Sequence, residues 1–294
     1  MSIDGFLVVD KAPGMTSHDV VAIARRALGT RKVGHAGTLD PMATGVLVLG
    51  FGIGTRLLQY ITDGDKSYSA TVVLGQSTVT DDAEGEVLTN ASTEQLAAIT
   101  DEMIRVELSA MHGVIQQRPS SVSAVKVDGQ RAHARVRAGE DVQLPAREVT
   151  ISQLDVLNIR RTETRIEIDI EVTCSAGTFI RAIARDCGQA LGVGGHLSAL
   201  RRTRVASFTL NPSVTIEQLK SAQFKALTIG EVAALTFPIR DISEEEVLEL
   251  SFGRSLALSK SMEITAAMAH GQLIALLSNN ESYAKPIAVF AAAS

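Results

Sequence analysis

The chain has 294 residues, of which 45% are apolar, and its formal net charge is −5 at pH 7. Such a chain buries enough core for one large domain and a smaller one, which excludes a disordered tail protein. The longest apolar runs fall far short of the roughly 20 residues of a membrane-spanning helix, and the N-terminus has no signal-peptide pattern, so we expect a cytoplasmic protein without a membrane partner.

The first half of the chain is predicted to alternate strands and helices. Ser17 and Asp19 open an apolar-periodic stretch that Gly29 closes, which is typical of a helix. A glycine-rich loop follows this helix. The other expected elements are strands at residues 6–10, 46–49 and 68–74 and a helix at residues 93–108.

The second half begins with a segment that does not resemble a core. Residues 116–147 mix arginine and lysine with small polar residues, and we predict that they protrude as a basic excursion. Residues 151–157 and 165–173 alternate like paired strands, with IEIDIEV placing acids on one face and aliphatic side chains on the other. A helix is expected from Thr178. Around Pro238 the pattern breaks, and we place a domain boundary there.

The charge of the chain is unevenly distributed. Residues 1–60, 116–147 and 174–205 carry net charges of +2, +3 and +4, whereas residues 61–109 carry −8. If the fold brings the three basic segments together, they form one surface for phosphate groups. The alternative is that each segment is simply a solvated face.

Cysteine and histidine give no sign of a cross-link or a metal. The two cysteines, Cys174 and Cys187, lie thirteen positions apart without a CxxC pairing, and the six histidines are scattered. Neither a disulfide framework nor a zinc site is indicated, and we expect no metal.

The most informative run is GHAGTLDPMATG, residues 34–45. Pro41 biases Asp40 away from helical geometry, and the glycines let the backbone approach a ligand or another segment closely. The pattern therefore indicates a carboxylate on a tight loop at the edge of a sheet. The alternative is an Asx-type turn in which Asp40 caps its own backbone.

A second candidate run is CSAGTFIRAIARD, in which Thr178 is positioned to cap a helix. Arg181 then lies in the first turn and Arg185 four residues later on the same face. Cations near a helix N-terminus oppose the helix dipole, and like charges at this spacing repel. We therefore expect a compensating anion, either a protein carboxylate or an RNA phosphate; the alternative is that both arginines extend into water.

Five motifs, in the same order along the chain, match one known family. They are GHAGTLDPMATG (34–45), DKSYSATVVLGQSTVTDDAEG (65–85), PSSVSAVKVDGQRAH (119–133), CSAGTFIRAIARDCGQALG (174–192) and GGHLSALRRTRV (194–205). With these motifs, which cover most of residues 5–210, the chain resembles the bacterial tRNA pseudouridine-55 synthase (TruB) family. The C-terminal region resembles the small PUA-type RNA-binding domain of that family only loosely.

The resemblance implies an α/β (α+β) fold with a mixed, mostly antiparallel sheet and flanking helices in residues 1–237. It also implies a thumb insertion at about 116–147 and a β-rich, PUA-like RNA-binding domain at residues 238–294. The implied activity is isomerisation of uridine to pseudouridine at position 55, in the T loop of tRNA. We expect no cofactor, and the compact C-terminal region without basic tails favours a stand-alone enzyme without guide RNA, which we expect to be a monomer.

The resemblance also assigns roles to individual residues. Asp40 is the expected nucleophile, Arg181 its ion-pair partner, and Tyr68 the ring against the target base. His35 is expected to help displace the nucleotide from the T loop. The remaining expected substrate contacts are Phe179 and Leu200, in the uracil pocket, together with Lys11 and Lys126.

The chemistry of pseudouridine formation explains why residues of these types are needed. The reaction breaks the bond from ribose C1′ to uracil N1 and makes one from C1′ to C5, without oxidation or net hydrolysis. It needs an ionised carboxylate for covalent attack and a dry pocket in which the freed uracil turns. A guanidinium beside Asp40 favours the anion. Flipping the base out costs a few kcal/mol, which stacking on Tyr68, worth about 1 to 3 kcal/mol, partly offsets.

Three positions depart from the usual motifs of the family. Phe179 stands where tyrosine is usual, DKAPG (10–14) replaces DKPxG, and His133 replaces a tyrosine in the thumb. Phe179 keeps the ring but lacks a hydroxyl near the nucleophile, which argues against a proton-transfer role for it. The sequence leaves open whether Asp40 attacks ribose C1′ or uracil C6.

Two alternatives belong to other functional classes. The run VLVLGFGIGTR suggests a dinucleotide-binding loop, but a G-x-G-x-x-G pattern that starts at Gly50 requires glycine at position 55, which is Thr55. The second alternative is a non-catalytic RNA-binding or tRNA-folding module on the same scaffold. Mapping pseudouridine in a treated tRNA transcript separates it from the enzyme.

Overall fold

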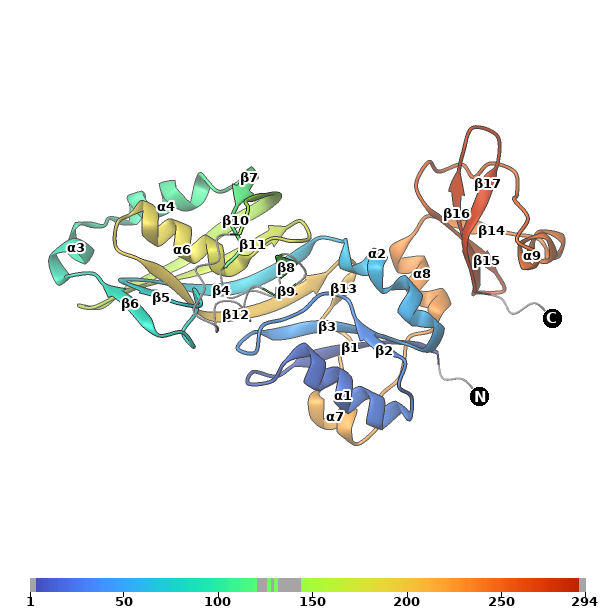
Figure 1. The fold of residues 1–294 in the computed structure, drawn as a ribbon, viewed down its shortest axis with the longest axis horizontal. Helices are drawn as coiled ribbons and strands as arrows, with labels where there is room; N and C mark the ends of the chain where they lie inside the picture. The colour runs from blue at the N-terminus through green and yellow to red at the C-terminus, as the bar shows by residue number, and fades with distance from the viewer. Residues whose placement is uncertain (1–3, 121–125, 128–129, 132–143, 291–294) are drawn as a thin grey trace.

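The computed structural model describes residues 4–120, 126–127, 130–131 and 144–290 (Figure 1). Its largest element is a nine-stranded sheet. The strands of this sheet are β1 (Gly5–Lys11), β2 (Val33–His35), β3 (Thr44–Phe51), β4 (Lys66–Leu74), β7 (Gly113–Gln117), β10 (Arg147–Arg161), β11 (Ile166–Cys174), β12 (Gly195–Val205) and β13 (Phe208–Thr209). Their order is β1-β3-β12-β4-β11-β10-β7, with β2 paired to β3 and β13 to β12. All of these pairs are antiparallel except β3 with β12, which confirms the expected mixed, mostly antiparallel sheet.

Helices and short strands surround this sheet. The helical segments are α1 (Ser17–Leu28), the 3-10 helix η1 (Gly52–Leu57), α2 (Leu58–Thr62), α3 (Thr93–Ala98), α4 (Asp101–Ser109), α6 (Ile180–Ala190), α7 (Ile216–Lys220), α8 (Ile229–Thr236) and α9 (Glu244–Ser251). The short strands are β5 (Gln76–Thr78), β6 (Val87–Asn90), β8 (Lys126–Val127) and β9 (Gln130–Arg131). One apolar core joins α1, α4, α6 and α7 to the main sheet.

Helix α1 forms where the sequence predicts it. Thr16 is its N-cap and exchanges hydrogen bonds with Asp19 in a capping box, one residue earlier than the predicted opening. The helix ends at Gly29, which has a φ of 62°, a left-handed conformation that favours glycine. Caps at both ends therefore fix the length of this helix.

The single helix expected at residues 93–108 is wrong, because the chain forms two helices there. Ile99 is extended, with φ −79° and ψ 120°, and ends α3. The hydroxyl of Thr100 then accepts a hydrogen bond from the backbone N–H of Met103 and caps α4. Threonine is a favoured N-cap residue. It therefore stabilises the start of a second helix within a run whose apolar spacing predicts one continuous helix.

The paired strands predicted at 151–157 and 165–173 are confirmed as parts of β10 and β11. In β11 the aliphatic side chains are buried, whereas the acids between them are half-buried or exposed. The basic excursion leaves and returns at one edge of the sheet, since Arg147 of β10 is paired with Gln117 of β7. Residues 121–125, 128–129 and 132–143 of this excursion lie outside the described part of the chain.

A second sheet forms the C-terminal part. Its strands are β14 (Ile239–Asp241), β15 (Thr265–Ala269), β16 (Gln272–Asn279) and β17 (Ala284–Val289), paired in chain order. This sheet lies at one end of the molecule, with α8 between it and the main sheet (Figure 1). None of the described helices is long and apolar enough to cross a membrane.

The one parallel pairing of the main sheet determines where distant motifs meet. It aligns Thr44 and Gly45 with Arg201 and Arg202. A side chain on Gly45 would overlap the backbone carbonyl of Arg202, and Gly45 has a φ of 100°. Glycine is therefore required here for the GHAGTLDPMATG loop to lie directly beside the GGHLSALRRTRV strand.

Candidate active site

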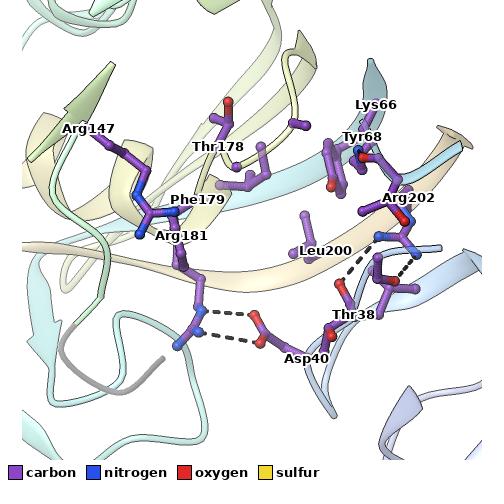
Figure 2. Close-up of a pocket in the computed structure, with 16 residues that line it drawn as sticks. Thr38, Asp40, Lys66, Tyr68, Arg147, Thr178, Phe179, Arg181, Leu200 and Arg202 are labelled. Carbon is purple, nitrogen blue, oxygen red and sulfur yellow. Dashed lines mark hydrogen bonds and ion pairs between the residues drawn. The ribbon is translucent and has the colours of Figure 1, made fainter. Parts of the chain in front are cut away.

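A cavity of about 360 Å³ lies between the loop that connects β2 to β3 and the N-terminus of α6 (Figure 2). This volume falls within the range of small-molecule sites. In the described part of the chain, its lining combines apolar and aromatic side chains with one carboxylate and several cations. The lining side chains that bear on the chemistry are Asp40, Lys66, Tyr68, Arg147, Phe179, Arg181, Leu200 and Arg202.

Asp40 and Arg181 form a two-point ion pair at this cavity, as expected. Arg181 Nε lies 3.0 Å from Asp40 Oδ2, and its Nη2 donates to Oδ1 at 3.4 Å. The Arg181 side chain is 8% exposed, and that of Asp40 is 36% exposed. The carboxylate thus faces a buried guanidinium rather than its own backbone, which disfavours the Asx-turn alternative.

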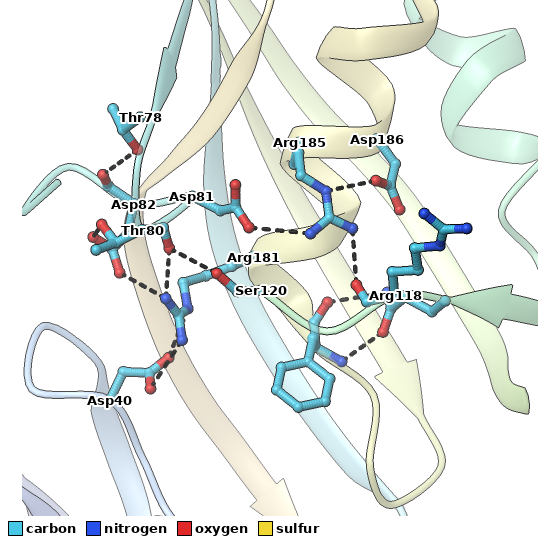
Figure 3. A network of polar contacts seen from close by, with 12 residues as sticks. Asp40, Thr78, Thr80, Asp81, Asp82, Arg118, Ser120, Arg181, Arg185 and Asp186 are labelled. Carbon is cyan, nitrogen blue, oxygen red and sulfur yellow. Dashed lines mark hydrogen bonds and ion pairs between the residues drawn. The ribbon is translucent and has the colours of Figure 1, made fainter. Parts of the chain in front are cut away.

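Arg181 has further partners on the turn that follows β5 (Figure 3). Its Nη1 donates to the carbonyl of Thr80 at 2.5 Å and lies 3.3 Å from Asp82 Oδ2. Because the Asp82 side chain is only 6% exposed, the guanidinium bridges a buried carboxylate and a half-exposed one. This arrangement fixes the orientation of Arg181 before any substrate binds.

The second arginine of this helix is also paired. Arg185 Nη1 lies 3.2 Å from Asp81 Oδ2, its Nε lies 2.8 Å from Asp186 Oδ1, and its Nη2 donates to the carbonyl of Arg118 at 2.9 Å (Figure 3). The expectation of compensating anions is confirmed for both arginines, with protein carboxylates in that role. The alternative, in which both extend into water, is wrong.

The predicted cap of this helix is wrong. The N-cap is Phe179, which makes no side-chain capping hydrogen bond, and α6 begins at Ile180. The hydroxyl of Thr178 instead donates to the carbonyl of Ser175 and closes the preceding turn. The side-chain amide of Gln117 binds the N-terminus of α6 instead. Its oxygen accepts a hydrogen bond from the Phe179 N–H at 2.7 Å, and its nitrogen donates one to the Phe179 carbonyl at 3.1 Å.

Arg202 holds the chain just before Asp40. It is 1% exposed, and its Nε and Nη2 donate to the carbonyls of Val46 and Gly37 at 2.8 and 3.0 Å. Burial lowers the pKa of Arg202, while Tyr68 and Asp40 oppose this effect. A buried cation thus fixes the backbone that carries the candidate nucleophile.

The structure corrects the expectation that Lys11 contacts RNA. Its side chain is buried, and its ammonium donates to the carbonyls of Ala12, Pro41 and Ala43 at 2.9, 3.1 and 2.6 Å. Burial lowers its pKa from 10.5 to about 8, against the attraction of Asp40. Lys11 therefore holds the loop after Asp40, as Arg202 holds it before, and its charge is not available to a phosphate.

The apolar walls come from three of the predicted residues. Tyr68 is 8% and Leu200 7% exposed, and Phe179 lies across from them (Figure 2). Burial raises the pKa of Tyr68 to about 12, with Arg202 acting in the opposite direction, so the phenol is neutral at pH 7. The cavity thus offers ring faces and an aliphatic side chain next to one carboxylate.

Two other predicted residues are not among those that line the cavity in the described part of the chain. His35 does not line the cavity; its ring packs edge-on against His18 at 5.6 Å, and its buried Nδ1 has no hydrogen-bond partner among the described residues. Burial is the main cause that lowers the pKa of His35. The backbone of Lys126 belongs to β8, but its side chain lies outside the described residues.

Models of known protein families account for nearly the whole chain. Residues 25–180 match the TruB family pseudouridylate synthase N-terminal domain. Residues 181–236 match the tRNA pseudouridylate synthase B C-terminal domain, and residues 237–291 match the C-terminal domain of tRNA pseudouridine synthase II. The chain belongs to the TruB family of pseudouridylate synthases. As a member of that family it is an isomerase.

Relatives of this TruB-family chain match it over nearly their full length. The tRNA pseudouridine synthase B of Corynebacterium diphtheriae is 53% identical over 274 residues, which are 93% of this chain and 91% of the relative. The tRNA pseudouridine synthase B of an Arthrobacter species is 52% identical over 301 residues, covering 98% of this chain and 97% of the relative.

Solved structures share the TruB-family fold at low sequence identity. A chain from an H/ACA RNP bound to a substrate RNA containing 2′-deoxyuridine has a TM-score of 0.72 at 23% identity, covering 99% of this chain and 86% of that chain. A chain of the archaeal box H/ACA sRNP Nop10-Cbf5 complex has a TM-score of 0.71 at 24% identity, covering 99% of this chain and 87% of that chain. At these identities the likeness establishes the fold.

Sequence reasoning missed several residues of this TruB-family site. Asp82 lies within a quoted motif, and a carboxylate partner for Arg181 was expected, but no local pattern selects Asp82 from its acidic neighbours. Arg202 also lies in a motif, two positions after Leu200, yet nothing in the sequence indicates that it is buried. Arg147 lies at the end of the basic excursion, where its role is indistinguishable from that of the other arginines.

Nothing in the described part of this TruB-family chain resembles a metal site. No group of three or more histidine, cysteine, aspartate or glutamate residues is positioned there to hold an ion. Both cysteines are buried, and burial raises the pKa of Cys174 to about 11 and that of Cys187 to about 12. They behave as small apolar side chains.

Proposed function

We propose that this enzyme isomerises uridine to pseudouridine in tRNA, at position 55 of the T loop, with Asp40 as the nucleophile. The observation that carries the proposal is the two-point pair between Asp40 and Arg181 at the edge of a cavity walled by Tyr68, Phe179 and Leu200. The curated relatives that match the chain over its length are tRNA pseudouridine synthases B, which supports tRNA as the substrate.

In the proposed reaction Asp40 attacks the everted nucleotide, at ribose C1′ or uracil C6, and the bond from C1′ to N1 breaks. The uracil turns within the cavity, C5 bonds to C1′, and the bond to Asp40 breaks, which restores the free carboxylate. The proton that leaves C5 is balanced by the one that N1 gains. Arg181 orients the carboxylate through the two-point contact. The product is an isomer of the substrate, so no other reactant is consumed.

The walls of the cavity have two tasks in this proposal. Tyr68 and Phe179 offer aromatic faces to the base, and stacking of this kind is worth about 1 to 3 kcal/mol per base. Leu200 helps exclude water while the uracil is detached. Because the Tyr68 phenol is neutral at pH 7, we assign it stacking and hydrogen bonding rather than the role of a general base.

The surroundings of the cavity would hold the rest of the RNA. We propose that the thumb, residues 116–147, grips the RNA with its basic side chains and that His35 helps displace the nucleotide from the T loop. We further propose that residues 1–237 are the catalytic domain and residues 238–294 a PUA-like RNA-binding domain. The enzyme would act in the cytoplasm as a monomer without guide RNA.

The decisive experiment compares wild type with Asp40→Asn on an unmodified tRNA transcript. Wild type should form pseudouridine at position 55, and Asp40→Asn should form none while it still binds the transcript. The exposed Asp241, on β14, provides the matched control, Asp241→Asn, which should retain the wild-type rate. Equal rates for wild type and Asp40→Asn would refute the proposed nucleophile.

The alternative of a non-catalytic module predicts a different result. Wild type would then bind the transcript without forming pseudouridine, and the aspartate substitution would change nothing. A transcript with cytidine at position 55 tests the site itself, because it should yield no pseudouridine in its T loop.

A further inference from the structure

Four cations of the described residues line the cavity, and three of them already have polar partners. They are Lys66, Arg147, Arg181 and Arg202. The ammonium of Lys66 donates to the carbonyls of Thr62 and Gly64, each at 2.7 Å. Arg181 contacts carboxylates, and Arg202 donates to backbone carbonyls. The N–H donors of Lys66, Arg181 and Arg202 are therefore engaged in contacts within the protein.

Arg147 is held in a different way. Its guanidinium carbon lies 5.5 Å from the centroid of the Phe179 ring, and the side chain makes no ion pair or hydrogen bond with any other described residue. Figure 2 shows its guanidinium beside Phe179, on the side of the cavity away from Tyr68 and Arg202. The residue itself is only half-buried.

The ring contact positions the guanidinium without neutralising it. A cation over an aromatic face is attracted by the ring quadrupole, but the N–H donors at its edge stay free. A carboxylate partner would instead remove the charge and occupy two donors. Arg147 is also fixed at its base, because it is the first residue of β10 and is paired with the buried Gln117.

We propose that Arg147 binds a phosphate group of the nucleotide that enters the cavity. This inference rests on the proposed function and extends it by one named RNA contact. A guanidinium matches two phosphate oxygens with parallel hydrogen bonds, and its weak hydration favours such contacts. When the base lies between the apolar walls, its sugar-phosphate linkage lies toward the opening of the cavity. There the positive charge of Arg147, which pairs with no carboxylate of the described residues, attracts the phosphate.

The test compares Arg147→Gln with a matched substitution on the same strand. Arg160 lies on β10, is exposed, and pairs with the carboxylates of Glu167 and Asp169, so Arg160→Gln serves as the control. Binding of the unmodified tRNA transcript is measured from 50 to 300 mM salt, together with kcat and KM. Urea unfolding of each variant shows whether its fold is intact.

A phosphate contact predicts three results. Arg147→Gln should bind the transcript roughly 10-fold or more weakly, because a hydrogen bond to a charged group is lost. The slope of log K against log salt should become shallower by about 0.7 to 0.9, the value for one phosphate. Arg147→Lys should keep most of that slope, because it keeps the charge.

Other outcomes overturn the proposal. Wild-type affinity and slope for Arg147→Gln would exclude a phosphate contact. Weak binding by both Arg147 variants with an unchanged slope would mean that the guanidinium stacks on a base instead. If wild type itself forms no pseudouridine, the proposed function fails independently, while the salt dependence still reports whether Arg147 meets a phosphate.

Discussion

Replacing Arg181 with methionine should lower stability and turnover for two separable reasons. The loss of stability comes from Asp82, whose side chain is 6% exposed and which loses its guanidinium partner at 3.3 Å. Removing one partner of a buried pair costs about 3 to 5 kcal/mol. The lower end applies here, because Asp82 Oδ1 still accepts hydrogen bonds from the Thr80 hydroxyl and the Glu84 N–H. The loss of turnover comes from Asp40, which loses the guanidinium that orients it.

The double variant Arg181→Met/Asp82→Asn separates these effects. Asparagine removes the unpaired charge, so the unfolding free energy from urea titration should recover by about 2 kcal/mol or more. The single-turnover rate of pseudouridine formation should stay as low as in Arg181→Met. Recovery of turnover together with stability would refute the reasoning, since Arg181 would then act only through the fold. If Arg181→Met were as stable as wild type, the claim that buried Asp82 depends on Arg181 would be refuted.

Three further predictions concern the neighbouring residues. Tyr68→Leu should lower kcat/KM for tRNA by the equivalent of about 1 to 3 kcal/mol of lost base stacking; an unchanged kcat/KM would contradict a stacking role. For Lys11 the folded pKa of about 8 lies below the unfolded value of 10.5. Between pH 8 and pH 10.5 the unfolded chain therefore binds more protons than the folded one, and the stability of the fold rises with pH. From pH 8 to pH 10, the unfolding free energy of wild type, measured by urea titration, should rise by about 2 kcal/mol relative to that of Lys11→Met. A difference between the two unfolding free energies that does not change with pH would count against the buried ammonium. Gly45→Ala should lower the unfolding free energy by more than the roughly 1 to 3 kcal/mol of a strained backbone, because its side chain would also overlap the Arg202 carbonyl; a loss under about 0.5 kcal/mol would contradict that requirement.

Local patterns were sufficient to predict part of the fold, but not β12, which lies between β3 and β4 in the main sheet. The cap residues of α1 and the alternation of β11 are encoded within a few neighbouring positions. The break at Ile99 was missed because the apolar spacing continues through it, and only the cap at Thr100 distinguishes two helices from one. Helix α1 and strand β11, each with one dominant signal, were therefore predicted correctly, whereas residues 93–108, which carry two competing signals, were not.

The candidate site was predictable in its chemistry but not in its supports. The motifs indicated Asp40 and Arg181, and the structure brings the two side chains together. They did not indicate that Lys11 turns its ammonium toward backbone carbonyls, because exposed and buried lysines look alike in a sequence. The role of Arg202 depends on the parallel pairing of β3 with β12, which joins segments about 160 positions apart and leaves no local pattern.

That same pairing has a consequence for how the molecule is made. The loop of Asp40 emerges early in synthesis, but Arg202, which holds the backbone before it, emerges only after about two thirds of the chain. Contacts between such distant positions form late, because the intervening chain must first be ordered. A product cut short on the ribosome before β12 would thus carry the proposed nucleophile on an unsupported loop, and we expect such fragments to be inert toward RNA rather than weakly active.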